Sequence, residues 1–385
     1  MRVLLLTGKG GVGKTSLSLA TALGAAAHGH RAFVLSTDPA HSLGDALRRR
    51  LGPRPVPVAP GVVAQEVSVL EEMDRSWSAI QRFLRGLLRD DADELVAEEL
   101  LAFPGLEELV ALRAIREVEA TGAYDVCVVD CAPTGATLRM LRFPDVLRIF
   151  MENFYQTKRR GVRLVRPLLE RLHVGSLVPG EDTLDAFERL YADVDAVRAI
   201  LLDDARTSAR LVVNPARVVV DETRRSFAYL SLYGVATDAV LVNRVLPGAA
   251  AEGWFARWAA REREELAAIE AAFPVPRFFA PLYARELAGL PDLQQLARDL
   301  YGERDPAALF TRARPIRLRK HMGRPRLEID LPGASKEELE VIARGPDLLV
   351  RVRDATRLVG LPGSVVGRTV KRARLDSGVL TVDFE

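Results

Sequence analysis

Lysine, cysteine and long apolar runs are all scarce in this sequence. Only six of the 54 basic residues are lysine, and with 52 acidic residues the net charge is +2. A charge so near zero gives no reason to expect a nucleic acid or an anionic membrane as a general partner. No run of about 18 uncharged apolar residues is present, which excludes an ordinary transmembrane helix. The chain passes from Arg2 straight into an apolar stretch, so we expect no signal peptide and a cytoplasmic location.

Cysteine chemistry has little support, because the chain has only two cysteines. Cys127 and Cys131 lie at the two ends of an apolar stretch, and four residues of extended chain span about 13 Å. That separation exceeds the Cα distance of a disulfide. We therefore expect both thiols to pack as small apolar groups near the end of a strand.

Two of the six lysines lie in one glycine-rich loop, which reads GKGGVGKT over residues 8–15. The loop fits the pattern G-x-x-x-x-G-K-[ST], and it lies between an apolar stretch and a helix-prone one, as a phosphate-binding loop must. Its glycines let backbone N–H groups converge on a polyphosphate at the start of a helix. The sequence therefore predicts a nucleoside triphosphate site formed by Gly8, Lys9, Gly10, Gly11, Val12, Gly13, Lys14, Thr15 and Ser16.

The loop is the deviant Walker A form, because ordinary P-loops leave the position of Lys9 unspecified. Four later segments complete the pattern: STDPAHSLGDA at 36–46, DCAPTGATLR at 130–139, VLVNR at 240–244 and APL at 280–282. Together with the loop they resemble one family, the ArsA/Get3 ATPases. The first two segments are similar to the family's switch I and switch II, and the last two to its adenine-side segments. MinD and ParA relatives share the deviant loop but not the two switch-like segments.

The resemblance implies ATP and Mg²⁺ as cofactors and gives each catalytic residue a role. Lys14 reaches the β- and γ-phosphates, and the Thr15 hydroxyl ligates Mg²⁺. Asp38 orients or deprotonates the attacking water near the metal, and Asp130 lies close to Mg²⁺ or to a water bound to it. Lys9 contacts phosphate across a homodimer interface, as an arginine finger does in other ATPases.

The same resemblance places Asn243, Pro281 and Leu282 beside the adenine. An amide such as Asn243 both donates and accepts at a base edge. For His41 we expect a structural role. The zinc-binding Cys-x-x-Cys pair of eukaryotic Get3-like members is missing after the adenine segment, and the metalloid cysteines of the arsenite-pump branch are missing as well.

Three functions remain open. The first is a homodimeric Get3-like ATPase whose closure on ATP gates the binding of a hydrophobic client segment or apolar ligand, with transient contact to a membrane or a membrane protein. The second is the ATPase subunit of an arsenite or anion extrusion pump. The third is a ParA/MinD-like positioning ATPase, which would need a basic nucleic-acid face or an amphipathic membrane helix.

Apolar stretches and helix-prone segments alternate along residues 1–301, which predicts an α/β fold, a P-loop NTPase with a mostly parallel sheet. Strands are expected at 2–7, 32–36, 124–130, 210–213, 238–243 and 276–280. Long helical insertions are expected between 66 and 118 and between 144 and 203. Apolar stripes in them are the expected client groove, although amphipathic core helices would show the same pattern.

The pattern changes towards the C-terminus. Residues 302–326 are charged and contain proline, which predicts a linker. Residues 327–385 then show strands with period-two alternation and turn signals at 332–333, 362–363 and 377–378. Their order resembles the α-crystallin (HSP20) domain of small heat-shock proteins, so we expect an all-β sandwich that is an autonomous interaction module.

Overall fold

The computed structural model describes residues 1–37, 42–67, 106–132, 181–248, 253–321, 323–344, 347–361 and 365–385, together with Gly135, Leu138 and Leu141. Asp38, His41 and the apolar stripes of the two insertions lie outside these residues. Their expected roles stay predictions.

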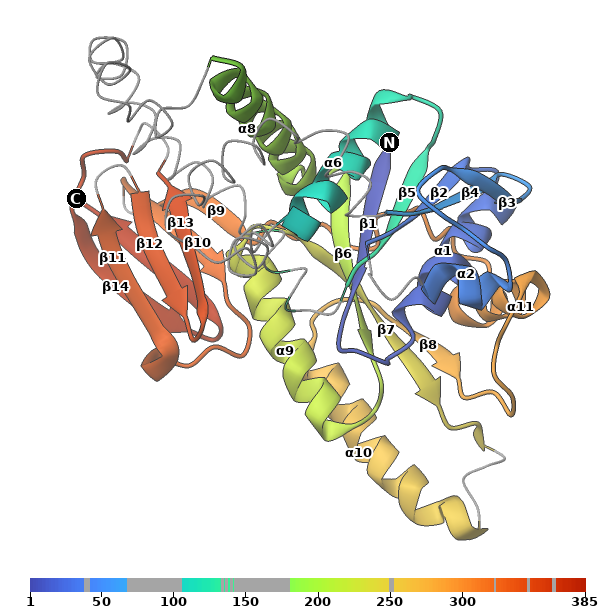
Figure 1. The fold of residues 1–385 in the computed structure, drawn as a ribbon. Coiled ribbons are helices and arrows are strands. Elements are labelled where there is room, and N and C mark those ends of the chain that lie inside the picture. Colours follow the sequence, from blue (N-terminus) through green and yellow to red (C-terminus); the bar gives the residue numbers. More distant parts are fainter. Residues whose placement is uncertain are drawn as a thin grey trace, which may run out of the picture.

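An eight-stranded sheet forms the centre of the first region, in the order β3-β4-β2-β5-β1-β6-β7-β8 (Figure 1). All neighbours are parallel except the edge pair β3 and β4. The strands are β1 (Arg2–Thr7), β2 (Ala32–Ser36), β3 (Val56–Ala59), β4 (Val62–Glu66), β5 (Val126–Asp130), β6 (Thr207–Val213), β7 (Thr237–Val245) and β8 (Arg277–Pro281). The six strands predicted from sequence are confirmed. Strands β3 and β4 were not predicted, because both are short and partly exposed, and β3 is an edge strand that contains Pro57.

Helices cover both faces of this sheet, and alternate residues of each strand contact opposite layers. They are α1 (Lys14–Ala27), α2 (Ser42–Leu47), α6 (Leu106–Ala120), α8 (Glu181–Leu202), α9 (Arg217–Leu232), α10 (Ala256–Ala272) and α11 (Leu290–Tyr301), with a short 3-10 helix, η3 (Gly253–Phe255), before α10. Leu4 and Leu6 of β1 pack in the hydrophobic cluster of α1 and α11, whereas Val3 and Leu5 pack in the cluster of α6, α8, α9 and α10. Burial on two faces explains why these strands are continuous apolar runs.

Two antiparallel sheets form the C-terminal region, in the orders β14-β15-β10-β9 and β11-β12-β13. Their strands are β9 (Ile316–His321), β10 (Arg324–Asp330), β11 (Leu339–Arg344), β12 (Asp347–Val352), β13 (Ala355–Gly360), β14 (Val370–Asp376) and β15 (Val379–Phe384). A 3-10 turn, η4 (Lys336–Glu338), precedes β11. Strand β9 falls inside the segment expected as a linker and pairs with β10. Its sequence, IRLRKH, is mostly exposed at a sheet edge, so apolar alternation could not mark it.

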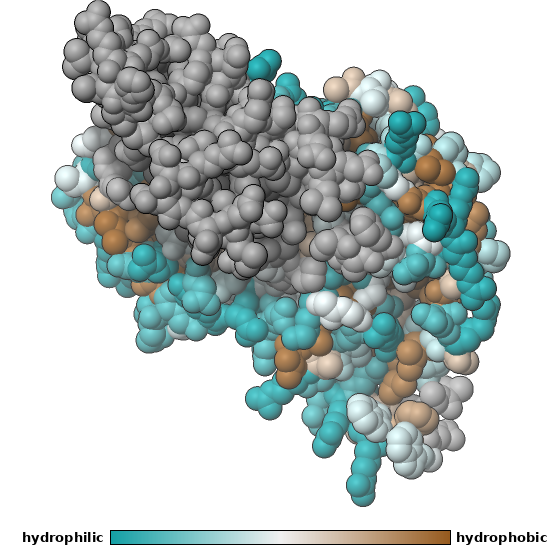
Figure 2. Space-filling view, viewed as in Figure 1, coloured by the Kyte–Doolittle hydropathy of each residue, from teal (hydrophilic) through white to brown (hydrophobic). Residues whose placement is uncertain are grey.

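The C-terminal sheets share a hydrophobic cluster with the region of the central sheet. Leu327, Ile329 and Phe384 belong to the same buried cluster as Phe227 and Leu230 of α9. Helix α9 lies between the central sheet and these strands (Figure 1) and contacts β10. Hydrophilic side chains dominate the described surface on the face shown in Figure 2. The C-terminal sheets are thus joined to the first region by an apolar contact as well as by the chain itself.

Candidate nucleotide site

The glycine-rich loop joins β1 to α1 at the carboxyl edge of the central strands. Gly13 has φ 96°, in the left-handed region that favours glycine. A Cβ on Gly13 would lie 2.3 Å from Nδ2 of Asn243, so a side chain there would collide with the neighbouring strand end. The loop therefore depends on this glycine to bring β1, α1 and β7 together.

The two loop lysines point to different surroundings. Lys14 is only 6% exposed, and its Nζ donates to the backbone oxygen of Lys9 at 3.2 Å. The Lys9 side chain is 39% exposed, and its Nζ lies 2.7 Å from Oε2 of Glu222 on α9. One ammonium group is therefore held against the loop, while the other extends away from it.

Hydroxyl and carboxylate oxygens gather beside the first turn of α1. Oγ1 of Thr15 lies 2.9 Å from Oγ of Ser42, and Ser18 Oγ donates to Oδ1 of Asp130 at 3.2 Å. Asp130 is fully buried at the end of β5, and its backbone oxygen accepts from the Thr37 N–H at 3.0 Å. These hard oxygen donors are the kind that Mg²⁺ prefers, and Mg²⁺ usually completes its shell with phosphates and water.

A protein-only metal cage is not present among the described residues, where no three His, Cys, Asp or Glu side chains are grouped to hold an ion. The oxygen set beside Thr15 instead fits a metal carried in with a nucleotide. Of the residues expected to hold Mg²⁺, Thr15 and Asp130 lie in this set, and Asp38 lies outside the described residues.

The side chain of Asn243 stabilises the glycine-rich loop in this structure. Its Nδ2 donates to the backbone oxygen of Val12 at 2.8 Å, and its Oδ1 accepts from the Arg244 N–H at 2.9 Å. Asn214, at the end of β6, donates to the backbone oxygen of Asn243 at 3.2 Å. The expected contact of Asn243 with adenine stays a prediction, and the hydrogen bond to Val12 adds a supporting role that the sequence did not reveal.

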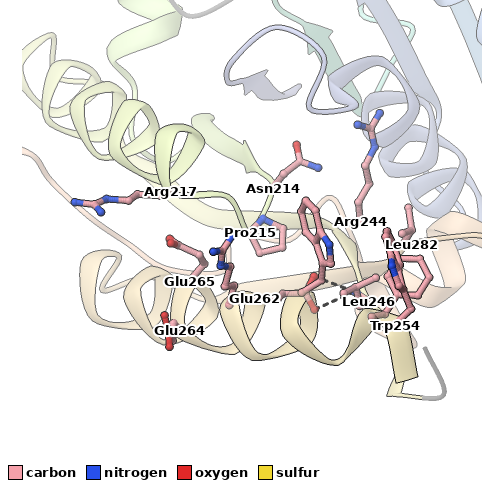
Figure 3. Close-up of a pocket in the computed structure, with 13 residues that line it drawn as sticks. Asn214, Pro215, Arg217, Arg244, Leu246, Trp254, Glu262, Glu264, Glu265 and Leu282 are labelled. Carbon is pink, nitrogen blue, oxygen red and sulfur yellow. Dashed lines mark hydrogen bonds between the residues drawn. The ribbon is translucent and has the colours of Figure 1, made fainter. Parts of the chain in front are cut away.

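A cavity of about 820 Å³ opens beside Asn214, at the ends of β6, β7 and β8 (Figure 3). Its lining combines aromatic, apolar and charged side chains: Asn214, Pro215, Arg217, Arg244, Leu246, Trp254, Phe255, Trp258, Arg261, Glu262, Glu264, Glu265 and Leu282. Leu282 lines this cavity, and its expected contact with adenine stays a prediction. Pro281, which ends β8, is not among the lining residues.

Two features define the shape of this cavity. Arg244 has φ 61°, a conformation that non-glycine residues rarely adopt and that is often found at functional sites. Both carboxylate oxygens of Glu262 accept from the Leu246 N–H, at 3.0 and 3.1 Å, which ties the segment after β7 to α10 (Figure 3). Burial raises the pKa of Glu262, and the hydrogen bond from Leu246 opposes that rise.

Sequence reasoning missed several residues that the fold brings to the site. Ser42 and Thr37 lie in the switch I-like segment, so the resemblance already contained them. Glu222 had no such signal, because it lies 213 positions from Lys9 and within an ordinary amphipathic helix. Trp254 and Trp258 are 80% and 59% exposed at the cavity, and no motif marked them.

Neither Cys127 nor Cys131 is in a disulfide, and both are buried, as expected. Burial raises the pKa of Cys127 to about 12, so this thiol stays protonated at neutral pH. No helix in the described part of the chain is long and apolar enough to cross a membrane.

Comparison with known proteins extends the observations on the loop and the C-terminal sheets. Residues 1–302 match the ArsA family of anion-transporting ATPases, and residues 323–384 match the HSP20-like domain found in ArsA proteins. A protein of Prosthecochloris vibrioformis named "Putative arsenical pump-driving ATPase" is 34% identical over 95% of this chain and 92% of its own length. A Streptomyces coelicolor protein named "Uncharacterized protein SCO2128" is 36% identical over 100% of this chain and 97% of its own length.

Proposed function

We propose a function for this chain from the premise that it belongs to the ArsA anion-transporting ATPase family and is therefore an ATP hydrolase. In this proposal the protein acts as a homodimer, and its closure on ATP gates the binding of an apolar client. ArsA-family ATPases are typically dimeric. The observation that carries the proposal is the divergence of the two loop lysines. Lys14 is buried against the loop, whereas Lys9 extends from it, is 39% exposed and pairs with Glu222 of α9.

The chemistry follows from the charge that develops during phosphoryl transfer. Negative charge spreads over the transferred group and the leaving oxygen, so positioned cations supply most of the rate enhancement. In our proposal Lys14 neutralises the β- and γ-phosphates within one subunit, and Lys9 of the second copy adds a cation from across the interface. Thr15 and Asp130 would hold Mg²⁺, which adds further positive charge at the phosphates. Asp38 would orient the attacking water.

The action of Lys9 across the interface is tested with mixed dimers. Lys9→Ala and Asp38→Asn subunits are each expected to form nearly inactive homodimers. In a mixed dimer, the Lys9→Ala subunit keeps its own Asp38 and receives Lys9 from the other copy. We therefore expect about half of the wild-type turnover per dimer, since one of two sites is restored. Mixed dimers no more active than the two parents would show that Lys9 acts within its own subunit.

The client is proposed to be an apolar segment, supported by the apolar stripes of the two insertions. A suitable probe is a fluorescent peptide of about 20 Leu and Ala residues with charged ends, the length of a membrane-spanning helix. Asp38→Asn protein with ATP is expected to bind it, and Lys14→Ala protein is expected not to. Equal binding with and without ATP in the Asp38→Asn variant would remove nucleotide gating from the proposal.

A second candidate is the ATPase of an arsenical pump, which the name of the Prosthecochloris relative favours. The burial of Cys127 and Cys131 speaks against it, because a metalloid needs accessible thiolates. The two candidates separate in one assay: arsenite should stimulate hydrolysis by a pump subunit and leave it unchanged in a client-binding ATPase.

A further inference from the structure

Helix α9 connects the phosphate loop to the C-terminal sheets. Near its start, Glu222 Oε2 lies 2.7 Å from Nζ of Lys9. At its other end, the backbone oxygen of Leu232 accepts from Nη1 of Arg357 on β13 at 2.5 Å. Leu232 lies ten residues after Glu222, which is about 15 Å along the helix, since each residue adds about 1.5 Å. One rigid element thus contacts Lys9 at one end and the C-terminal module at the other.

The contact at the far end is built from buried groups. Arg357 is only 7% exposed, and its guanidinium meets the last carbonyl of α9, where the helix dipole favours a cation. Gly234, with φ 82°, lies just after the end of the helix, and a Cβ there would lie 2.9 Å from Nη1 of Arg357. The Tyr233 hydroxyl donates to the backbone oxygen of Thr356 at 3.3 Å. The end of α9 is therefore shaped to receive β13.

The contact at the near end is weaker and reversible. The side chains of Lys9 and Glu222 are 39% and 27% exposed, so water competes for both charges. Ion pairs with this exposure contribute little to stability, so binding of a polyphosphate to Lys9 can displace the carboxylate of Glu222.

We propose that Glu222 is a positioning residue that stores Lys9 within its own chain, and that the C-terminal module sets this storage through α9. With β13 seated on Leu232, α9 holds Glu222 at Lys9. Pairing of two copies on ATP requires each Lys9 to leave Glu222 for the other copy's phosphates. The inference rests on the proposed action of Lys9 across a dimer.

The first test is Glu222→Gln, which keeps the size of the side chain and removes its charge. Two stored lysines are released per dimer, so the protein concentration giving half-maximal ATP turnover should fall about threefold to tenfold. Turnover per site at saturating protein concentration should not change, because our proposal gives Glu222 no contact with the phosphates or the attacking water once Lys9 has left it. Glu222→Asp keeps the carboxylate and should stay close to wild type.

Glu270→Gln is the matched control. It makes the same chemical change at a residue of α10. There it breaks a surface ion pair of similar length, in which Glu270 lies 2.9 Å from Arg277 of β8. Its concentration dependence should match that of the wild type. An unchanged midpoint in Glu222→Gln, with mixed Lys9→Ala and Asp38→Asn dimers active, would overturn storage while leaving the action of Lys9 across the interface intact. Inactive mixed dimers would instead overturn the proposed function on which storage rests.

The second test addresses the module. Tyr233→Phe removes one hydroxyl, and Arg357→Lys keeps the charge but loses the geometry of the guanidinium. Each should shift the same midpoint in the same direction as Glu222→Gln. Added to Glu222→Gln, neither should shift it further, because the charge that α9 positions is already gone. A full additional shift in the double variants, or no shift in either single variant, would show that the module does not act through α9.

Discussion

The two regions of this chain bury their strands in different ways. Strands β1, β2, β5 and β6 of the parallel sheet are buried over nearly their whole length, whereas β10, β12 and β15 alternate between buried and more exposed residues. Helices on both faces leave only the strand ends of the parallel sheet open to ligands, and the proposed nucleotide site lies there. The antiparallel sheets keep one face for solvent or a partner.

The ion pairs of the two regions differ in burial, as the strands do. In the ATPase region, Arg210 and Asp238 form an ion pair in which both side chains are 0% exposed, and Arg2 also contacts Asp238. In the C-terminal region, Arg326 pairs with Asp383 on the outer face of the sheet, with the side chains 22% and 26% exposed. A charge in the first pair cannot be hydrated if its partner is lost, whereas one in the second pair can.

The largest expected difference is in ATP turnover, between a lysine substitution in the phosphate loop and one in the C-terminal region. Lys14→Ala should lower ATP turnover by at least about a hundredfold, because it removes a preorganised cation from the transferring phosphates. Lys371→Ala makes the same change on exposed β14 and should leave turnover unchanged. Steady-state hydrolysis measured side by side decides the matter. Substantial activity in Lys14→Ala would place the catalytic cation elsewhere.

Breaking an ion pair should lower the free energy of unfolding more in the ATPase region than in the C-terminal region. Asp238→Asn leaves Arg210 buried without its countercharge and should lower the free energy of unfolding by about 3 to 5 kcal/mol. Asp383→Asn should cost at most about 1 kcal/mol, since Arg326 regains water. Urea denaturation of both variants measures the difference. Equal losses would mean that the outer face of the C-terminal sheet is not solvated in the native protein.

Small core substitutions test whether the regions unfold together. Ile115 in α6 and Ile329 in β10 are both fully buried in the cluster that spans the two regions. Each Ile→Val change should cost about 0.5 to 1.5 kcal/mol. Because the cluster is shared, we expect one transition that moves by a similar amount in both variants. Two transitions, each sensitive to only one substitution, would support the autonomous module expected from the sequence.

The smallest expected effect concerns the cysteines. A raised pKa means that the Cys127 thiol keeps its proton until pH approaches 12, so little thiolate exists at pH 7 to 9. Native protein should therefore react very slowly with a thiol reagent over this range, and both cysteines should react once urea unfolds the chain. Rapid native labelling would show that the strand end at Cys131 opens to solvent.

Residues 8–15 and the apolar runs were enough to predict the loop, the six main strands of the parallel sheet and the class of the C-terminal region. This worked because phosphate loops and strands buried on two faces impose local patterns. Strand β9 was not predicted, since edge strands with charged side chains carry no such pattern. The ion pairs on its outer face, such as Arg317 with Asp330 at 2.6 Å, appear only once β9 and β10 are aligned.

What the sequence determined by itself is therefore local chemistry: a nucleotide loop, its flanking strand and helix, and the alternation of the C-terminal strands. Tertiary structure alone decided which distant groups meet. It brought Glu222 to Lys9, Asn243 to Val12 and Arg357 to the end of α9. These contacts depend on how helices and sheets pack, and packing is set by the summed burial of many apolar side chains, which no short segment records.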